Sequence, residues 1–373
     1  MVLSSLFIVA IIVQCTYVLY FFTRILWLPS GQELSPEDRE SVSVIICARN
    51  EAANLVKNLP AVLAQHYRGK DGKPLFEVVV VNDGSTDDTA TILQQLEAQH
   101  NHLKVVTIPQ DADRTLPGKK YALSVGLSHA AHDQLLLTDA DCKPASSNWL
   151  ALMTAPLGKG KEIVAGYGGY EKTPGLLNAF IRWETVHTFL QYCTYAMTGR
   201  PYMAVGRNLA CTRKALMLAQ QNPAWSALPS GDDDLLVNIA GNGHNTTVVG
   251  NPEAFTYSEA KATMQDWVQQ KQRHLSTGKY YRHSTQLLLG LYAVSHALVW
   301  FCFFALVAAG GGKAVILPMA VRSLLCWLSL FAAGRKLNEQ KSGWSIPFFD
   351  LAWMVYNFAF LPYITWKNKQ HWK

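Results

Sequence analysis

The stretch L-L-L-T-D-A-D-C, residues 135–142, passes from three leucines to two aspartates within a few positions. A continuous apolar run is typical of a strand that is buried on both faces, as in the parallel sheets of α/β proteins. The carboxylates of Asp139 and Asp141 are close enough to repel each other unless a cation lies between them. The stretch therefore predicts a buried strand that ends in a polar site.

Strands and helices alternate on both sides of this stretch. Strands are predicted at 41–48, 77–81, 103–108 and 134–138, and helices follow at about 50–63, 87–98 and 120–129, the first with Asn50 as its N-cap. This alternation implies βαβ units, so we expect an α/β fold with a mostly parallel sheet. In such sheets, ligands bind at the carboxyl ends of the strands.

Two acidic turns follow predicted strands. N-D-G-S, residues 82–85, follows one strand, and D-A-D, residues 139–141, follows another. Good turn residues alone explain one such turn, but two favour a shared site. Carboxylates are hard ligands, so the D-A-D pair predicts a divalent cation, Mn²⁺ or Mg²⁺, at Asp139 and Asp141. Without a cation we expect a raised pKa on one of the pair or a disordered turn.

Two further motifs each allow two interpretations. G-D-D-D, residues 231–234, is either an acidic helix start, which the helix dipole favours, or the location of a general base that faces the metal site. W-V-Q-Q-K-Q-R-H, residues 267–274, is either a basic helix at lipid head groups or a helix whose arginine reaches a diphosphate.

The composition indicates a membrane protein. Charged residues make up 16% of the chain, against about 25% in a typical soluble protein. Long apolar runs at 2–22, 285–312, 314–334 and 345–366 are candidate membrane segments, the first a retained anchor. Arg322 and Asp350 interrupt the last two, so either they pair across adjacent helices or these segments lie partly in the interface.

These features predict four parts, with the catalytic domain on the cytoplasmic side of a membrane such as the bacterial inner membrane. The parts are an anchor at 1–28, a catalytic domain at 32–284, a membrane region of two to three helices at 285–366 and a basic tail at 367–373. The seven cysteines include no C-x-x-C pair, which agrees with a reducing compartment. No nucleic-acid partner is predicted.

The motifs together resemble those of family 2 glycosyltransferases, between about Val42 and His274. The resemblance rests on V-S-V-I-I-C-A-R-N-E, V-V-V-V-N-D-G-S-T-D-D-T, P-G-K-K-Y-A-L, T-D-A-D, G-D-D-D and Q-K-Q-R-H, in this order. It looks most like membrane-bound members such as ceramide glucosyltransferases and the processive cellulose and hyaluronan synthases. The resemblance implies a GT-A fold and inverting transfer of a sugar from a UDP-sugar.

The resemblance also implies roles for individual residues. Asp83 would contact the uridine, Asp139 and Asp141 would hold the metal on the donor diphosphate, and Asp233 would be the catalytic base with Asp232 before it. Further residues at the nucleotide would be Ala48, Arg49, Glu51 and Lys119.

The family motif Q-x-x-R-W corresponds to residues 270–274. Gln270 and Arg273 would act at the donor diphosphate, and Trp267 and His274 would lie on the acceptor side. His274 stands where the family has a tryptophan, so an imidazole would replace the indole at the acceptor side.

The predicted acceptor is a membrane-associated molecule, most simply a lipid hydroxyl. About ten residues, 275–284, join the Q-x-x-R helix to a membrane segment, so the site should open near the bilayer. Residues 175–197 form either an interfacial element or a buried helix. The alternatives are a processive polysaccharide synthase, a catalytically silent membrane scaffold or transporter subunit, and a nucleotidyltransferase.

Overall fold

The computed structural model describes residues 1–339 and 346–365, and the predicted basic tail at 367–373 lies outside them. The described residues divide into two compact units. The sheet unit comprises residues 29–171 and 199–261, and the helical unit comprises 1–28, 172–198, 262–339 and 346–365. The predicted catalytic domain, 32–284, contributes to both units.

The sheet unit has a central sheet of seven strands in the order β3-β2-β1-β4-β8-β6-β9. The first four in this order run parallel, β8 is antiparallel to its neighbours β4 and β6, and β9 is parallel to β6. The predicted α/β fold with a mostly parallel sheet is therefore confirmed. The strands of this sheet are β1 (Val42–Ala48), β2 (Phe76–Asp83), β3 (Leu103–Ile108), β4 (Gln134–Asp139), β6 (Ile163–Ala165), β8 (Leu209–Thr212) and β9 (Thr246–Val248).

Helices cover both faces of this sheet, and a second sheet has the order β5-β10-β7. The remaining strands are β5 (Lys143–Pro144), β7 (Gly168–Tyr170) and β10 (Thr256–Ser258). The α-helices are α2 (Ala52–Leu63), α3 (Thr89–Gln99), α4 (Lys119–His129), α5 (Trp149–Thr154), α7 (Arg213–Gln220), α8 (Pro223–Ala227) and α9 (Asp234–Ala240), and the 3₁₀ turns are η2 (Leu157–Lys159) and η3 (Pro252–Ala254).

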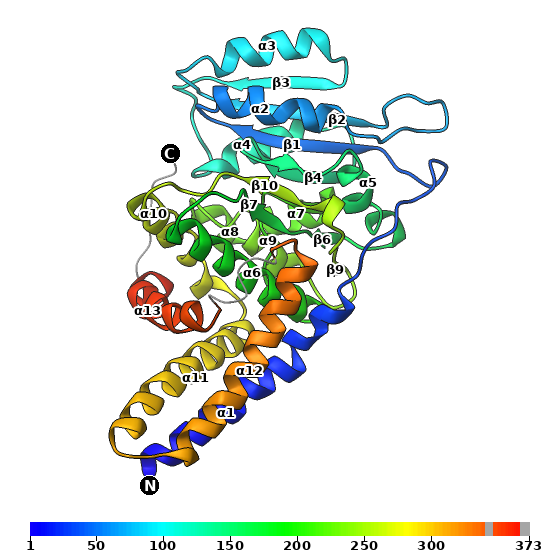
Figure 1. The fold of residues 1–373 in the computed structure, drawn as a ribbon. Coiled ribbons are helices and arrows are strands. Elements are labelled where there is room, and N and C mark those ends of the chain that lie inside the picture. The colour runs from blue at the N-terminus through cyan, green and yellow to red at the C-terminus, as the bar shows by residue number, and fades with distance from the viewer. Residues whose placement is uncertain (340–345, 366–373) are drawn as a thin grey trace. The chain divides into compact units, whose positions relative to one another are not determined.

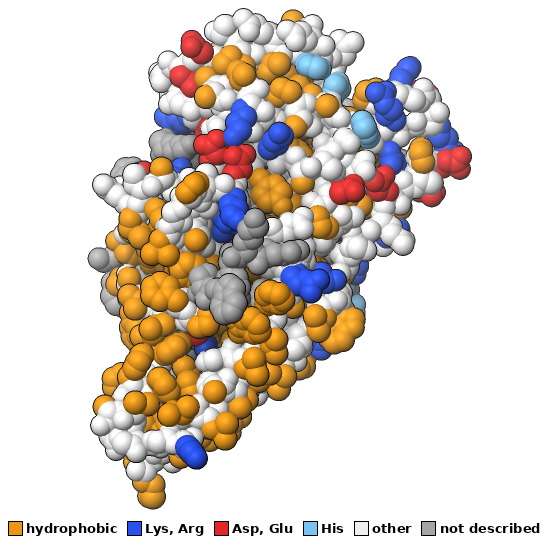
Figure 2. Space-filling view, in the orientation of Figure 1, with side chains coloured by type: hydrophobic (Ala, Val, Ile, Leu, Met, Phe, Trp, Pro, Cys, Tyr) orange, Lys and Arg blue, Asp and Glu red, His pale blue; other side chains and the backbone are white. Residues whose placement is uncertain are grey.

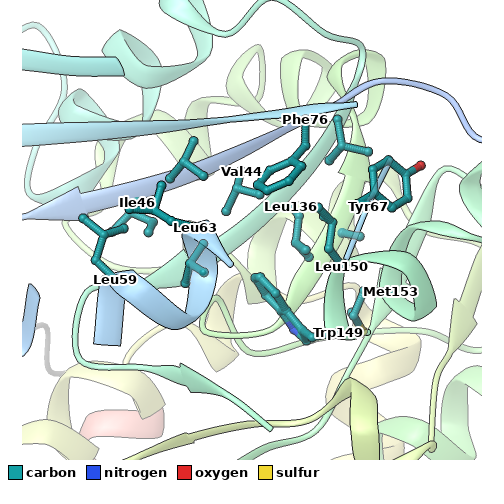
Figure 3. Packing of buried hydrophobic residues seen from close by; sticks show 14 of the residues in the cluster. Val44, Ile46, Leu59, Leu63, Tyr67, Phe76, Leu136, Trp149, Leu150 and Met153 are labelled. Atoms are coloured by element: carbon teal, nitrogen blue, oxygen red, sulfur yellow. The ribbon is translucent and has the colours of Figure 1, made fainter. Parts of the chain in front are cut away.

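The core of the sheet unit explains the leucine run that precedes the two aspartates. Leu135 and Leu136 are fully buried in β4 between β1 and β8. Figure 3 shows Leu136 in one cluster with Trp149 of α5 and with the alternate residues of β1 that face α2. On the opposite face, α4 lies so close that a Cβ on Gly126 would be 2.7 Å from the side chain of Ile45. The strand is therefore buried on both sides, as predicted.

The sheet register brings the predicted motifs to one edge. Ala48 of β1 is paired with Asn82 of β2, and Cys47 is paired with Asp139 of β4. Because these strands are parallel, their carboxyl ends lie side by side. The two acidic turns therefore leave the sheet at the same edge.

The prediction for Asn50 was wrong. The helix begins at Ala52 with Glu51 in the N-cap position, and Asn50 has a φ of 55°. The Asn50 side chain instead accepts a hydrogen bond from the amide of Thr86 at 2.8 Å. A tertiary contact to the β2 loop therefore replaces the local capping contact.

The helical unit contains three helices that are long and apolar enough to cross a membrane, among the residues that the structure describes. The candidate spans are Val2–Trp27, His283–Ala308 and Lys313–Lys336. Figure 1 shows α1, α11 and α12 side by side, and Figure 2 shows hydrophobic side chains over the surface of this bundle. The elements are α1 (Val2–Tyr20), η1 (Phe22–Trp27), α6 (Leu176–Met197), α10 (Met264–Leu275), η4 (Gly278–Tyr280), α11 (His283–Ala308), α12 (Lys313–Lys336) and α13 (Ile346–Thr365).

The two charged residues that interrupt the last two apolar runs form a buried ion pair. Arg322 of α12 is fully buried and pairs with Asp350 of α13. His296 and Trp300 of α11 each lie 3.2 Å from a carboxylate oxygen of Asp350, and Arg322 donates to Gln14 of α1 at 2.9 Å. The first of the two alternatives, pairing across adjacent helices, is therefore the observed one.

Helix α6 carries the predicted segment 175–197. Most of its side chains are buried in the helical unit, including Trp183 and Glu184. The helix is therefore buried, as in the second alternative, but it belongs to the helical unit with the candidate spans and not to the sheet unit, and Leu176 at its start is exposed.

Candidate active site

The loops after β1 and β2 are joined by hydrogen bonds. Asn50 donates its amide N–H to Ser85 Oγ at 3.0 Å, and Glu51 donates its amide to Thr89 Oγ1 at 2.9 Å. Arg49 is half-buried directly after Ala48, the buried last residue of β1. These hydrogen bonds hold the two loops, which carry predicted nucleotide-binding residues, together at one edge of the sheet.

Asp83 is a buried carboxylate with one unused oxygen. Its side chain is 0% exposed, and its Oδ1 pairs with the guanidinium of Arg114. Its Oδ2 is buried and has no hydrogen-bond partner among the described residues. A buried acceptor of this kind is costly unless a ligand supplies a donor, so Asp83 is suited to bind an N–H group of a nucleotide base.

Asp139 and Asp141 meet at the end of β4, together with Cys142. One ligand atom from each of the three lies within 4.8 Å of the others. Burial, followed by the charges of Asp139 and Glu51, raises the pKa of Asp141, which confirms the expected raised pKa. Burial and the Asp141 charge also raise the pKa of the Cys142 thiol well above its ordinary value, so it stays protonated. Two carboxylates without a thiolate fit a hard divalent cation.

Lys119 connects this pair to the G-D-D-D motif. Its ammonium pairs with Asp139 and lies 3.4 Å from Oδ2 of Asp232. Burial lowers the pKa of Lys119, but the charges of Asp139 and Asp232 outweigh this and hold the pKa well above its ordinary value. The Lys119 ammonium therefore contacts carboxylates of two motifs that are more than ninety residues apart in the sequence.

Asp233 has the properties of a general base. Its Oδ2 accepts from the amide of Gly206 at 2.6 Å, and its Oδ1 accepts from the amide of Asp234 at 2.8 Å. Burial, then the charges of Asp232 and Asp234, raises its pKa to about 7. A carboxylate with a pKa near neutrality is well matched to proton abstraction. Asp233 also stands at the N-cap position of α9, so the motif is an acidic helix start, and its role as a general base stays a prediction.

Lys120 and Gly118 fix the loop that leads to G-D-D-D. The Lys120 side chain is fully buried and donates to the carbonyls of Trp225, Leu228 and Ser230. Gly118 has a φ of 63°, and a Cβ at this position would lie 2.5 Å from the carbonyl oxygen of Pro229. In the P-G-K-K motif, Lys119 therefore lies in the site, whereas Gly118 and Lys120 hold the loop in place.

The residues of the Q-x-x-R segment lie in the helical unit, on α10. Trp267 is 4% exposed and packs within that unit against Phe180 and Tyr356, with ring centroids 5.7 and 5.8 Å away. Gln270 and Arg273 are half-buried, and His274 is exposed. Their roles at the donor and the acceptor stay predictions.

Sequence patterns did not identify two features of the sheet unit. Arg114, the partner of Asp83, lies in a loop without a motif. The segment 206–208, which provides the amide bonded to Asp233, precedes β8 and is 65 residues or more from the D-A-D turn. The signal that was available is the positive charge of Arg114 and Arg207.

Comparison with known proteins identifies the family. A model described as glycosyl transferase family 2 matches residues 43–201. The probable glycosyltransferase YdaM of Bacillus subtilis is 25% identical over 260 residues, which are 68% of this chain and 58% of the relative. The poly-beta-1,6-N-acetyl-D-glucosamine synthase of Staphylococcus aureus is 27% identical over 33% of this chain and 27% of the relative. The chain thus spans 58% or less of the length of these two relatives.

A solved structure shows the same fold. The mannosyltransferase PcManGT from Pyrobaculum calidifontis, in complex with GDP-Man and Mn²⁺, is similar over 94% of this chain and 99% of its own, with a TM-score of 0.57 and 20% identity. This likeness supports the GT-A fold. A second model, described as glycosyl transferase family group 2, matches residues 150–362, more than half of the 373 residues. The chain therefore belongs to glycosyl transferase family group 2.

Proposed function

We propose that this protein is an inverting glycosyltransferase that moves a sugar from a nucleoside diphosphate sugar to a membrane-associated acceptor. The observation that carries the proposal is the meeting of Asp139, Asp232 and Lys119 at one edge of the sheet, with Asp233 directly after Asp232. A metal-site carboxylate pair and a carboxylate of raised pKa are the two groups that such a transfer needs. That the chain resembles ceramide glucosyltransferases and cellulose synthases in particular is likewise proposed.

In the proposed reaction, Asp233 accepts the proton of an acceptor hydroxyl. The hydroxyl oxygen forms a bond to the anomeric carbon from the face opposite the nucleotide. The bond between that carbon and the phosphate oxygen breaks, and its electron pair leaves with the nucleoside diphosphate. A donor with an α linkage therefore gives a β-linked product.

The donor site is assigned to the loops after β1 and β2. Asp83 would accept a base N–H with its unpaired Oδ2, and Ala48, Arg49 and Glu51 would border the nucleotide. Uracil has such an N–H, which agrees with the expected UDP-sugar. Guanine also has one, and PcManGT binds GDP-Man, so both nucleotides need to be tested.

Asp139 and Asp141 would hold a divalent cation, Mn²⁺ or Mg²⁺. When bound, it would supply positive charge at the leaving diphosphate. Lys119 would supply a further positive charge, and Arg273 would add another if α10 reaches the donor. Gln270 on the same helix is assigned to the donor, and His274 and Trp267 to the acceptor side.

The acceptor is assigned to the membrane surface. Helix α10 ends at Leu275, and the candidate span α11 begins at His283. A lipid hydroxyl reaches such a position without leaving the bilayer. With three candidate spans in the described residues, transfer to a lipid is favoured over the extrusion of a polymer, which needs a channel. The ends of the anchor, the catalytic domain and the membrane region at residues 28, 284 and 366 are likewise proposed.

The orientation follows from charge. Basic residues lie at the end of the bundle where the chain leaves α1 and enters α11: Arg24 after α1, Lys279 and Arg282 before α11, and Arg335 and Lys336 at the end of α12. Lys313 lies at the opposite ends of α11 and α12. Because basic residues are enriched on the cytoplasmic side, the catalytic domain is assigned to the cytoplasm.

The test is a screen of UDP- and GDP-sugars with the purified full-length protein. Nucleotide release is measured with Mn²⁺ or with EDTA, in the presence and absence of extracted membrane lipids. We expect Mn²⁺-dependent release that lipids stimulate, with the label in a short glycolipid. Label in a high polymer would identify a processive synthase instead. Absence of nucleotide release from every sugar nucleotide would contradict the proposal and favour a silent scaffold.

A further inference from the structure

The segment 206–208 joins the predicted base to the strand that carries the metal site. The amide of Gly206 donates to Asp233 Oδ2 at 2.6 Å. The carbonyl of Arg207, the next residue, accepts from Thr138 Oγ1 at 3.0 Å, one position before the D-A-D turn. The backbone of this segment therefore lies between Asp233 and the end of β4.

Asn208 fixes the segment from the other side. Its side chain is fully buried and accepts from Trp149 Nε1 at 2.9 Å. It also donates to the carbonyls of Tyr167 at 2.9 Å and Ala254 at 2.8 Å. The backbone of Gly206 and Arg207 and the side chain of Asn208 are thus fixed by these hydrogen bonds.

The Arg207 side chain occupies a preformed cradle. It is half-buried, and its Cζ lies 4.2 Å from the centre of the Tyr170 ring. One guanidinium nitrogen donates to Ser258 Oγ at 3.3 Å. A Cβ on Gly168 would lie 2.6 Å from Nε of Arg207, so the strand accommodates the arginine because this position is a glycine. The guanidinium is therefore oriented before any ligand binds.

The Arg207 guanidinium has no ion pair among the described residues. It stacks on the Tyr170 ring and donates to the Ser258 hydroxyl. A half-buried, oriented guanidinium without an ion pair is suited to bind an anion.

We propose that Arg207 binds a phosphate group of the acceptor, next to the hydroxyl from which Asp233 takes the proton. This inference rests on the proposed function and narrows its acceptor to a lipid with a phosphate-bearing head group. A guanidinium fork matches two phosphate oxygens and forms stronger hydrogen bonds than a neutral donor. The acceptor is favoured over the donor because Arg207 follows directly after the residue whose amide holds Asp233, and Asp233 must face the attacking hydroxyl.

The test compares Arg207→Gln and Arg207→Lys with Arg213→Gln as a matched control. The Arg213 guanidinium donates to the backbone carbonyls of Leu127, Ala130 and His132, so its role is structural. Extracted membrane lipids are separated by anion exchange into neutral and acidic fractions, and each fraction is offered with the radiolabelled donor found in the screen. Binding of UDP or GDP with Mn²⁺ is measured on the same protein samples.

We expect the wild-type protein to label a lipid of the acidic fraction. Arg207→Gln should raise the lipid concentration for half-maximal transfer by about 10- to 100-fold, the usual effect of losing a charged hydrogen bond. Arg207→Lys should recover part of this loss, and nucleotide binding should stay within about twofold of the wild type. Arg213→Gln should lower the melting temperature without changing the lipid dependence.

Three results would overturn the inference. The first is a labelled neutral lipid with unchanged transfer by Arg207→Gln. The second is an equal loss of nucleotide binding in Arg207→Gln, which would assign the phosphate to the donor. The third is an equal change of the lipid dependence in Arg213→Gln, which would indicate a structural effect. If the wild type releases no nucleotide from any sugar nucleotide, the proposed function itself fails, and this outcome is distinct from the other three.

Discussion

The ammonium of Lys119 lies 3.4 Å from Oδ2 of Asp232 and also pairs with Asp139. The same lysine therefore neutralises one carboxylate of the metal site and one carboxylate beside the predicted base. A divalent cation held by Asp139 would compete with this ammonium, which would then be available to a donor diphosphate.

Lys119→Met should separate metal binding from nucleotide binding. Removal of the competing ammonium should strengthen the binding of Mn²⁺ alone, and removal of a phosphate partner should weaken the binding of UDP or GDP with Mn²⁺ by about tenfold. Titration calorimetry with Mn²⁺ alone and with the nucleotide checks both directions. Equal weakening of both would indicate a damaged site and contradict the assigned role.

Asp141→Asn should abolish Mn²⁺ binding and yet stabilise the metal-free protein. The pKa of Asp141 is raised in the folded state, so the folded protein binds the proton more tightly than the unfolded chain does. Wild-type stability should therefore fall as the pH rises from about 4 through this raised pKa, and the asparagine variant should lack this fall. Denaturant unfolding with EDTA at several pH values tests it, with Cys142→Ser as a control that keeps both carboxylates. Equal pH dependence of Asp141→Asn and the wild type would contradict the prediction.

Lys120→Met should destabilise the protein by about 3 kcal/mol, because three buried carbonyls lose their donor. Activity should fall as well, since the released loop leads to Asp232 and Asp233. Lys214 is a suitable control because it is 80% exposed and pairs with Glu162. Lys214→Met should change the unfolding free energy by less than about 0.5 kcal/mol. Equal effects of the two substitutions would argue against the anchoring role of Lys120.

Arg322→Leu and Asp350→Leu should each destabilise the helical unit by about 3 kcal/mol, because each leaves a buried charge without its partner. The double variant should cost less than the sum of the two, with a coupling of about 1–3 kcal/mol. Unfolding in detergent micelles measures the cycle. Additive effects would mean that the pair is not coupled and that its members are stabilised separately, for example through Gln14 and His296.

Local patterns predicted the elements of the sheet unit because their signals lie within a few residues. The strand at 103–108 has the predicted bounds, and β4 is one residue longer than predicted, ending at Asp139. The D-A-D turn follows from the change between buried leucines and carboxylates. The Asn50 cap failed because Thr86, which is 36 residues away, offers the competing hydrogen bond.

The parts of the candidate site that were missed depend on distant partners. The sequence around Lys120 does not indicate that its ammonium reaches carbonyls more than a hundred residues later. Arg207 lacks a motif, and its cradle depends on Gly168 of β7, which is distant in the sequence. Such contacts are set by the packing of the sheet unit and leave no periodic signal in the chain.

The most direct test of the account is the rate of sugar transfer as a function of pH for the wild type and for Asp233→Asn. Because the pKa of Asp233 is about 7 and only the ionised carboxylate accepts a proton, the wild-type rate should rise with pH through about 7. Asp233→Asn should lose this dependence and about 10²- to 10⁴-fold in rate, while its affinity for UDP or GDP with Mn²⁺ stays unchanged. Wild-type turnover in Asp233→Asn would contradict the assignment of Asp233 as the base.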